Sequence, residues 1–286
     1  MTEFVVVGTA TMLFLGVVGR MSQVMRDSSK IVTCQNNLRT LGWAQSVYTQ
    51  ENDYYPGGHW HGESPRWIYV WNARLRQVLD GNLDTFHCPD APQGFAWVPK
   101  YEKDWRPWPP NESWPRYGYD EDEVPHIGDP YNTRLYFSYG YNESGNREMF
   151  SGQRGLGMHP DPEDYERWAY LAEVPVEAVV NPADMIAIGD SRGDGDDDHV
   201  IYGRPKFVPG GDWPQNRWPG ERHRQGANIV FCDGHVEWDR RDNWVTAKSL
   251  PNPEARGRGY TLTAQRRWNS DNQPHMLDDL SDSDHQ

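Results

Sequence analysis

The chain has 286 residues and a formal net charge of -14, with 42 acidic residues against 28 lysines and arginines. Because phosphate recognition needs a concentrated positive surface, this balance argues against a nucleic-acid partner. Hydrophobic residues make up 36% of the chain, too few for a polytopic membrane protein. The 14 tryptophans and 15 tyrosines are costly to leave in water, so we expect a folded, aromatic-rich core rather than a disordered chain.

The first predicted element is a single long helix over residues 3–53. Residues 4–19 carry no charge and would span roughly 24 Å at about 1.5 Å per residue, a little less than a hydrocarbon core. The run contains small residues such as Gly8 and Gly16, which allow neighbouring helices to approach closely. We therefore expect residues 1–30 to pack on other helices, with a single membrane anchor as the alternative. The segment lacks a clear basic region and cleavage site of a secretory signal peptide.

The second half of the predicted helix, residues 31–54, is amphipathic instead. Apolar residues at spacings of three and four form one stripe, which Gln45 interrupts, and Pro56 stops the helix. Such a helix places its first half in a membrane or filament core and its second half against its own globular domain. The predicted organisation is therefore a helix over 1–54 and a globular α+β head over 55–286. The stripe consists of Ile31, Cys34, Leu38, Leu41 and Tyr48.

Within the head, the sequence predicts a short helix over residues 67–79 and strands over 134–141 and 184–188. The stretch 89–130 is dense in Pro, Trp and acidic residues, shows no sustained period, and is interpreted as a long loop. Short strands with long connections of this kind favour an antiparallel sheet.

A β-hairpin is predicted around Asp233 and Gly234. Asp-Gly between two strand-like runs favours a two-residue type I′ turn, in which both residues take positive φ. Folding of the hairpin would explain most of this segment, but not His223, which lies outside it. The pairs predicted across the turn are Phe231 with Val236, Ile229 with Trp238, and Cys232 with His235.

Several segments, taken in order, resemble one family of bacterial proteins. Residues 34–56 resemble the segment after the membrane helix in prepilin-type proteins, the type IV pilin-like and type II secretion pseudopilin-like chains abundant in planctomycetes. Nine residues separate His223 from Asp233 and Gly234, which is the H-X9-DG motif of the prepilin-type processing-associated family. The resemblance covers most of the chain. It implies a type IV pilin-like fold, with a long N-terminal helix and a head built on an antiparallel β-sheet with long loops.

The resemblance also implies a set of assembly residues. Members of the family polymerise through the N-terminal helix, and an acid near its start pairs with the terminal amine of a neighbouring subunit. Here that role falls to Glu3, two positions earlier than in the family pattern. A carboxylate beside an apolar core needs a cationic partner, although a first-turn acid also favours the helix dipole. The expected assembly residues are Glu3, Phe4, Gly8, Phe14 and Gly16.

An acidic segment after the strand at 184–188 is a candidate calcium site. Its aspartates repel one another, and a hard cation with oxygen ligands would hold them together. The pattern departs from an EF-hand, and a solvated acidic loop is the alternative. The resemblance favours calcium, because related pseudopilins use it to order C-terminal loops; Ca²⁺ is the only cofactor expected. The predicted ligands are Asp190, Asp194, Asp196 and Asp198.

The H-X9-DG motif supplies another candidate cluster. Asp190, His223 and Asp233 would form a hydrogen-bond network if they converge, or a site for a metal other than calcium, which rarely takes His. The motif residues are His223, Asp233, Gly234 and His235. His59 and His61 offer two further ligands on one strand face, without an evident third.

A disulfide between Cys34 and Cys88 is a further expectation. Cys34 lies on the apolar stripe of the helix, and Cys88 precedes a proline at an expected strand end. An exported domain would oxidise these cysteines to each other, with buried free thiols as the alternative.

The function expected is that of a structural subunit of a type IV pilus-like or pseudopilus-like extracellular filament, without catalysis. The sequence shows no nucleophile elbow, P-loop, dinucleotide fingerprint or metalloprotease helix. The expected partners are further copies of the chain in a helical homopolymer, the inner-membrane assembly machinery and a prepilin peptidase, with insertion in the inner membrane before assembly. The alternatives are a minor pseudopilin of a type II secretion system and a membrane-tethered glycan-binding surface protein that does not polymerise.

Overall fold

The computed structural model describes residues 2–61, 67–91, 97, 117–120, 127–128, 137–143, 155–157, 173–193, 198, 200–201, 203, 219–244 and 266–273. Side chains are described from residue 14 onward, except within the three short strands of the smaller sheet and at residue 242.

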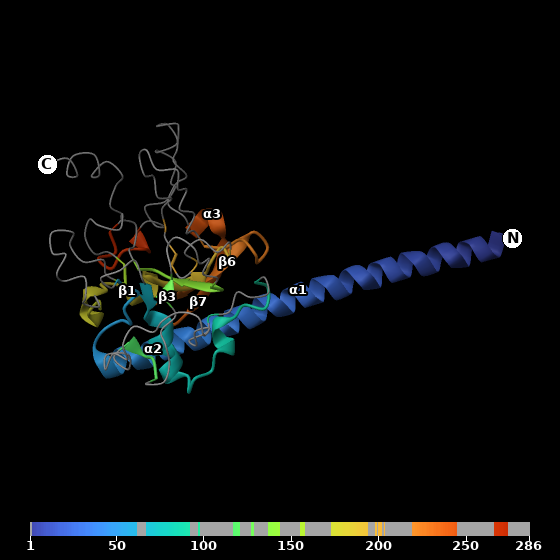
Figure 1. Ribbon diagram of the computed structural model, residues 1–286. Coiled ribbons are helices and arrows are strands. Elements are labelled where there is room, and N and C mark those ends of the chain that lie inside the picture. The colour runs from blue at the N-terminus through green and yellow to red at the C-terminus, as the bar shows by residue number, and fades with distance from the viewer. Residues whose placement is uncertain are drawn as a thin grey trace, which may run out of the picture.

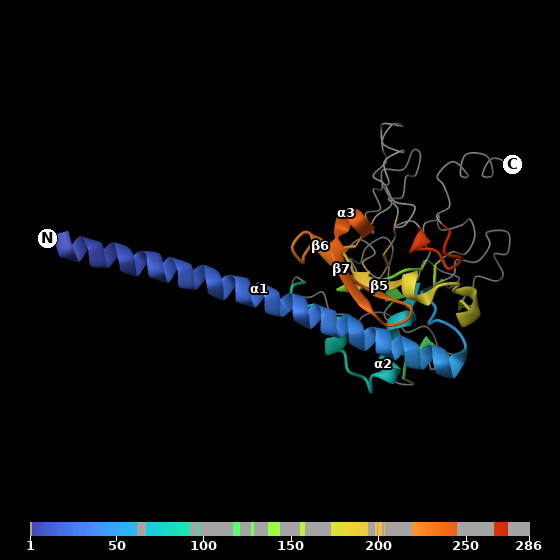
Figure 2. The same cartoon turned by 180° about the vertical axis from the view of Figure 1, so that it is seen from behind.

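One helix accounts for the elongated shape of the protein. Helix α1 (Thr2–Asn52) is continuous over 51 residues, or roughly 76 Å. Its first half extends away from the head and its second half lies along it (Figures 1 and 2). The prediction of one long helix is confirmed. Asp53, at a φ of 62°, follows its last turn, and Pro56 comes three residues later.

The head is built on a four-stranded antiparallel sheet in the order β4-β5-β6-β7. Its strands are β4 (Tyr139–Tyr141), β5 (Ile186–Asp190), β6 (Gly226–Phe231) and β7 (Val236–Arg240). A smaller antiparallel sheet contains β1 (His59–His61), β2 (Trp67–Tyr69) and β3 (Ile127–Gly128). The remaining helices are α2 (Trp71–Val78), α3 (Arg241–Trp244) and the single 3-10 turns Asp84–Phe86, Val176–Ala178 and Pro182–Asp184. The predicted α+β class with an antiparallel sheet is confirmed.

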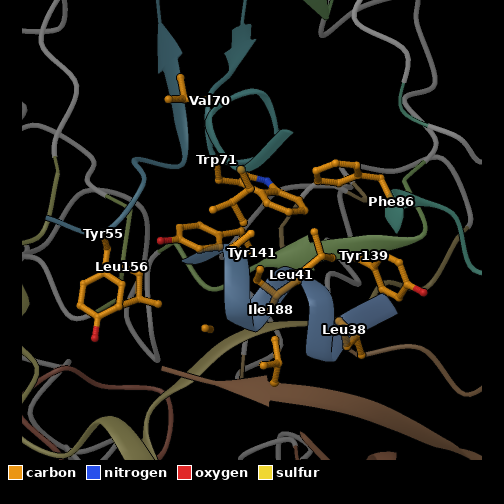
Figure 3. Packing of buried hydrophobic residues seen from close by; sticks show 14 of the residues in the cluster. Leu38, Leu41, Tyr55, Val70, Trp71, Phe86, Tyr139, Tyr141, Leu156 and Ile188 are labelled. Carbon is orange, nitrogen blue, oxygen red and sulfur yellow. The ribbon is translucent and has the colours of Figure 1, made fainter. Parts of the chain in front are cut away.

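Apolar residues cover both faces of the main sheet. On one face, α1 and α2 enclose Leu38, Leu41, Trp71, Tyr141 and Ile188, and the Trp71 and Tyr141 rings are stacked with centroids 5.7 Å apart (Figure 3). On the other face lies a second buried cluster. Its members are Ile186, Ile201, Ala227, Ile229, Phe231, Trp244 and Trp268. Burial on both faces explains why β6 is apolar almost throughout rather than alternating.

The predicted stripe of α1 is the surface that packs on the head. Cys34, Leu38 and Leu41 are fully buried, and Gln45 is buried with them. The helix lies close to the sheet at Gly42, where an added Cβ would lie 2.6 Å from Val230 Cγ2 and 3.1 Å from the Gly234 backbone. A side chain at position 42 would therefore push the helix off the hairpin.

Several predicted elements differ from the structure. The predicted strand over 134–141 begins later, because β4 starts at Tyr139 and residues 137 and 138 precede it, and the predicted loop over 89–130 contains β3. The predicted helix over 67–79 is wrong at its start, because residues 67–69 form β2 and the helix begins at Trp71. The predicted strand over 184–188 begins two residues later, after the 3-10 turn at Pro182–Asp184. Over 67–69, pairing with β1 and β3 overrides the helical pattern, whereas the strand pairs of β5 start only at Ile186. Residues 134–136 and most of the predicted loop 89–130 lie outside the described residues.

The hairpin exists, but its predicted register is wrong by one residue. Val230 lies opposite Val236, and Gly226, at the start of β6, lies opposite Arg240. Gly234 N–H donates to Phe231 C=O at 2.9 Å, and Gly234 has a φ of 89° whereas Asp233 is not in the positive-φ region. The connection is a type I turn followed by a left-handed glycine, which makes a three-residue loop. Phe231 rather than Cys232 therefore faces His235, with ring centroids 4.3 Å apart.

Candidate functional sites

The first half of α1 is an exposed surface with many apolar side chains. Residues 14–27 are all exposed, and Phe14 and Met25 keep 68% and 67% of their surface in contact with solvent. Contacts with the head begin at Ser28, whose hydroxyl accepts a hydrogen bond of 2.9 Å from Arg224. Within the described part of the chain, no helix is long and apolar enough to cross a membrane.

Most of the exposed large apolar residues lie on one side of this helix, although Leu15, Val17 and Val24 are exposed outside that side. Phe14 and Val32 are 18 residues, or about five full turns, apart and so lie on the same side. The same side continues along the outer surface of the head-bound half to Trp43, which is 56% exposed. We call these residues the outer stripe. It consists of Phe14, Val18, Met21, Met25, Val32 and Trp43. Leu38 and Leu41, which pack on the head, lie on the other side of the helix.

Among the predicted assembly residues, the structure describes the surroundings of two. Phe14 belongs to the outer stripe, and a Cβ added at Gly16 would meet no atom within 4 Å. Both positions are therefore free for contact with another molecule. Glu3, Phe4 and Gly8 lie on α1, but their side chains are outside the described residues.

The predicted calcium ligands fall in different environments. Asp190 is fully buried at the end of β5, where its Oδ2 accepts hydrogen bonds from Asn228 N at 2.7 Å and Nδ2 at 3.0 Å. Asp198 is buried too, and its Oδ1 accepts a hydrogen bond from Gly193 N at 2.9 Å. Asp194 and Asp196 lie outside the described residues. Calcium binding by this segment stays a prediction, which calorimetric titration checks by a Kd below about 1 mM.

The H-X9-DG residues separate to the two ends of β6. His223 pairs with Gly226 at the start of the strand, whereas Asp233, Gly234 and His235 form the turn after its end. Asp190 and His223 come together as predicted, with Oδ2 and Nε2 3.5 Å apart. Asp233 does not join them, because the six residues of β6 place the two ends of the strand roughly 17 Å apart. It instead accepts a hydrogen bond from His235 N at 3.1 Å and contacts Nδ1 of the same residue.

His223 is the centre of a buried cluster of sulfur, nitrogen and oxygen atoms. Its Nε2 lies 3.4 Å from Cys88 Sγ and 3.5 Å from Asp190 Oδ2, and its Nδ1 lies 3.6 Å from Asp90 Oδ2. The imidazole is fully buried, and among the described residues its Nδ1 has no hydrogen-bond partner. The backbone is held as well, since the Trp238 indole donates to His223 C=O at 2.9 Å.

A disulfide joins Cys34 on α1 to Cys88, with Cα atoms 5.2 Å apart. Neighbouring polar contacts reinforce the junction. Lys30 forms an ion pair of 2.9 Å with Asp90, whose carboxylate raises the pKa of the ammonium, and Asn37 Nδ2 donates to His87 C=O at 2.8 Å. The segment around residue 88 thus connects α1, where it enters the head, to the His223 cluster.

The third cysteine is separate from this cluster. Cys232 is a buried free thiol, and burial raises its pKa well above the ordinary value. A thiol that keeps its proton is a poor nucleophile and a poor metal ligand, so we interpret Cys232 as a core residue.

Some residues of the buried cluster were not predicted. Asp90 follows Cys88 by two residues and carries no periodic signal, while Asn228 was counted only as part of a strand. A polar residue inside the otherwise apolar run of β6 was the available signal for Asn228, because such a side chain needs a buried partner. The side chains of His59 and His61 on β1 are outside the described residues.

In comparisons with known proteins, the chain matches no protein-family model, no curated protein and no solved structure.

Proposed function

We propose that this protein is the structural subunit of a type IV pilus-like or pseudopilus-like extracellular filament that polymerises through α1. The observation that carries the proposal is the outer stripe, an apolar surface on a helix whose residues 14–27 are all exposed. The long helix and the antiparallel sheet are compatible with the type IV pilin-like fold that the sequence resembles.

The energetics favour covering this stripe. Burial of a large apolar side chain contributes about 1.5–3 kcal/mol, so several exposed together favour association strongly. Gly16 and Gly19 lie on the opposite side of the helix, so the large apolar side chains of the stripe carry this argument.

The position of the stripe favours an open polymer. It runs from the projecting half of α1 onto the outer side of the half that packs on the head, as far as Trp43. One subunit can therefore contact the projecting helix of a neighbour alongside its own head. Contacts between two different surfaces that do not close into a ring generate a helical filament.

The remaining parts of the proposal follow from the resemblance and from the disulfide. Disulfides persist in oxidising compartments, so the Cys34–Cys88 bond supports an extracytoplasmic location. In this scheme the chain is inserted in the inner membrane before assembly, and a prepilin peptidase and the inner-membrane assembly machinery act on it. Glu3 would pair with the terminal amine of a neighbouring subunit.

Electron microscopy tests the proposal directly. The purified full chain, kept in detergent and then diluted below the micelle concentration, should form filaments visible in negative stain and sediment as very large particles. A chain that begins at residue 28 should remain monomeric under the same conditions, because it lacks the projecting half of α1.

Two outcomes would contradict polymerisation. Monodisperse full-length particles would indicate a tether rather than a filament, and binding of polysaccharide by the chain from residue 28 would then favour a glycan-binding surface protein. Particles that contain two associated copies of the chain would favour a minor pseudopilin.

A further inference from the structure

We propose that Cys34, Cys88 and His223 bind one Zn²⁺ ion in the reduced chain, and that formation of the Cys34–Cys88 disulfide releases it. The three ligand atoms lie within 4.8 Å of one another, and all three residues are fully buried. Two thiolates and an imidazole are ligands that zinc prefers, and soft sulfur ligands disfavour calcium and magnesium. The inference concerns the head alone and does not depend on polymerisation.

The spacing of the donor atoms fits a tetrahedral zinc site. Zn–S bonds of about 2.3 Å and Zn–N bonds of about 2.0 Å place a sulfur and a nitrogen ligand roughly 3.5 Å apart at a tetrahedral centre. Cys88 Sγ and His223 Nε2 are already 3.4 Å apart. The two sulfurs have to separate to about 3.8 Å, and reduction of the bond between them permits that movement.

Asp190 lies beside this group of three ligands without belonging to it. Its Oδ2 lies 3.5 Å from His223 Nε2, close to the separation of roughly 3.4 Å expected for oxygen and nitrogen on one zinc ion. Among the described residues, its Oδ1 has no hydrogen-bond partner. Two hydrogen bonds from Asn228 hold the carboxylate in place, as outer-shell partners commonly do for ligating carboxylates.

The surroundings of His223 leave its Nε2 available to bind the metal. Nε2 faces the sulfur and Asp190, while Nδ1 lies 3.6 Å from Asp90 Oδ2 on the other side of the ring. A carboxylate that accepts the proton of the second ring nitrogen fixes the tautomer and strengthens the ligand.

The chemistry balances in both directions. A phosphine reductant gives two electrons to the disulfide and takes oxygen from water, whose two protons produce the thiols of Cys34 and Cys88. Zn²⁺ then displaces both thiol protons to solvent and binds the two sulfurs and Nε2. In reverse, a small-molecule disulfide takes two electrons from the thiolates, binds two protons from solvent to become two thiols, and leaves the Cys34–Cys88 bond and free Zn²⁺.

A zinc titration of the full chain tests the site. The protein is reduced with a phosphine, which does not chelate zinc as dithiols do, and is titrated against a chromophoric zinc chelator. We expect one Zn²⁺ per reduced chain, bound at least 100-fold more tightly than by the oxidised chain. Co²⁺ in place of zinc should produce the intense visible absorption of a tetrahedral site and a thiolate charge-transfer band.

Matched variants separate this site from other histidines and thiols. His223→Asn should weaken zinc binding at least tenfold and remove the tetrahedral Co²⁺ spectrum. His235→Asn, which changes an exposed histidine of the same motif, and Cys232→Ser, which removes the third thiol, should leave the stoichiometry and the spectrum unchanged. Equal zinc affinity of the reduced and oxidised chains, or of His223→Asn and the unchanged chain, would overturn the proposal.

Near-ultraviolet circular dichroism covers the case in which reduction unfolds the head. Recovery of the native spectrum on addition of one equivalent of Zn²⁺ would support the site. Failure of zinc to restore the spectrum of an unfolded reduced chain would overturn it.

Discussion

The two halves of α1 contain similar apolar side chains in opposite situations. In the half that packs on the head, Leu38 and Leu41 are fully buried, whereas Phe14 and Met25 in the projecting half are largely exposed. The backbone is the same continuous helix in both halves. Helix formation therefore does not distinguish them; the difference lies in whether the chain supplies its own covering surface.

This contrast separates stability from assembly. Substitutions on the head-facing side of α1 should change the free energy of unfolding of the head. Substitutions on the outer stripe should change association and leave the head intact. The predictions that follow test this division, from the largest expected effect to the smallest.

Met21→Arg should abolish filament formation. The substitution places a charge on the outer stripe, where burial against a neighbouring helix would desolvate it without a partner. Gln23→Arg is the matched control, because it adds the same charge two residues away on the opposite side of the helix. We expect the sedimentable fraction to fall at least tenfold in the first variant and less than twofold in the second. Equal losses would contradict a one-sided contact.

Removal of the disulfide should produce the largest loss of head stability. The two cysteines are 54 residues apart, and a loop of this length corresponds to about 4 kcal/mol in the chain-entropy treatment. The double variant Cys34→Ser with Cys88→Ser should show this loss in urea unfolding with a zinc chelator present. A change below about 1 kcal/mol would show that the bond does not constrain the unfolded chain.

Leu41→Ala should destabilise the head by about 3 kcal/mol, because it leaves a cavity between α1 and the sheet. Val32→Ala removes an exposed side chain from the outer stripe and should change the free energy of unfolding by less than about 0.5 kcal/mol. Both values come from urea unfolding of the detergent-solubilised chain. Similar losses in the two variants would indicate that the outer stripe is covered within the monomer.

Alkaline pH should unfold the head through its buried tyrosines. Burial raises the pKa of Tyr139 and Tyr141 above the ordinary value of 10.0. Above pH 10 the unfolded chain releases these protons while the native state keeps them, so stability is full below pH 10. It then falls by about 1.4 kcal/mol per pH unit and tyrosine until the native pKa is reached.

Tyr141→Phe sharpens this test. Among the described residues the Tyr141 hydroxyl has no hydrogen-bond partner, so its removal should leave stability at pH 7 equal or higher. The same variant should lose stability less steeply above pH 10. Urea unfolding at a series of pH values measures both effects, and an unchanged alkaline slope would show that Tyr141 does not titrate on unfolding.

Gly234→Ala should destabilise the head by about 1 kcal/mol, because the hairpin needs the φ of 89° at this position. The nearest atom to an added Cβ is Ser46 Oγ at 3.6 Å, so the loss arises from backbone strain and not from a clash. Gly19→Ala, in the middle of the projecting helix, should cause no loss of head stability. Equal stability of Gly234→Ala and the unchanged chain would contradict the three-residue loop.

The sequence predicted correctly those elements that depend on residues close to one another in the chain. The continuous run of helix-compatible residues, its amphipathic stripe and the stop near Pro56 predicted α1 to within one residue at each end. The Asp-Gly pair predicted a hairpin at the correct place. These features depend on residues close in sequence, so the sequence alone carries the signal.

The tertiary structure decided two features that the local sequence pattern could not predict: the strand at 67–69 and the register of the hairpin. Residues 67–69 suit a helix or a strand, and only the presence of β1 and β3 beside them favours the strand. The register of β6 and β7 differs from the predicted one because the loop has three residues with a left-handed Gly234, a choice that the Asp-Gly pair alone does not make. A shift of one residue exchanges the two faces of a strand, and only packing on both faces selects between the alternatives.

The buried cluster shows the same division at the level of a site. The sequence by itself determined a helix with two unlike halves, an antiparallel α+β head and the pairing expected of Cys34 with Cys88. Only the tertiary structure decided that His223 and Asp190 join that pair while Asp233 remains at the other end of β6. The reason is physical: spacing along a strand fixes distance along that strand, whereas contact between elements is fixed by which faces bury together.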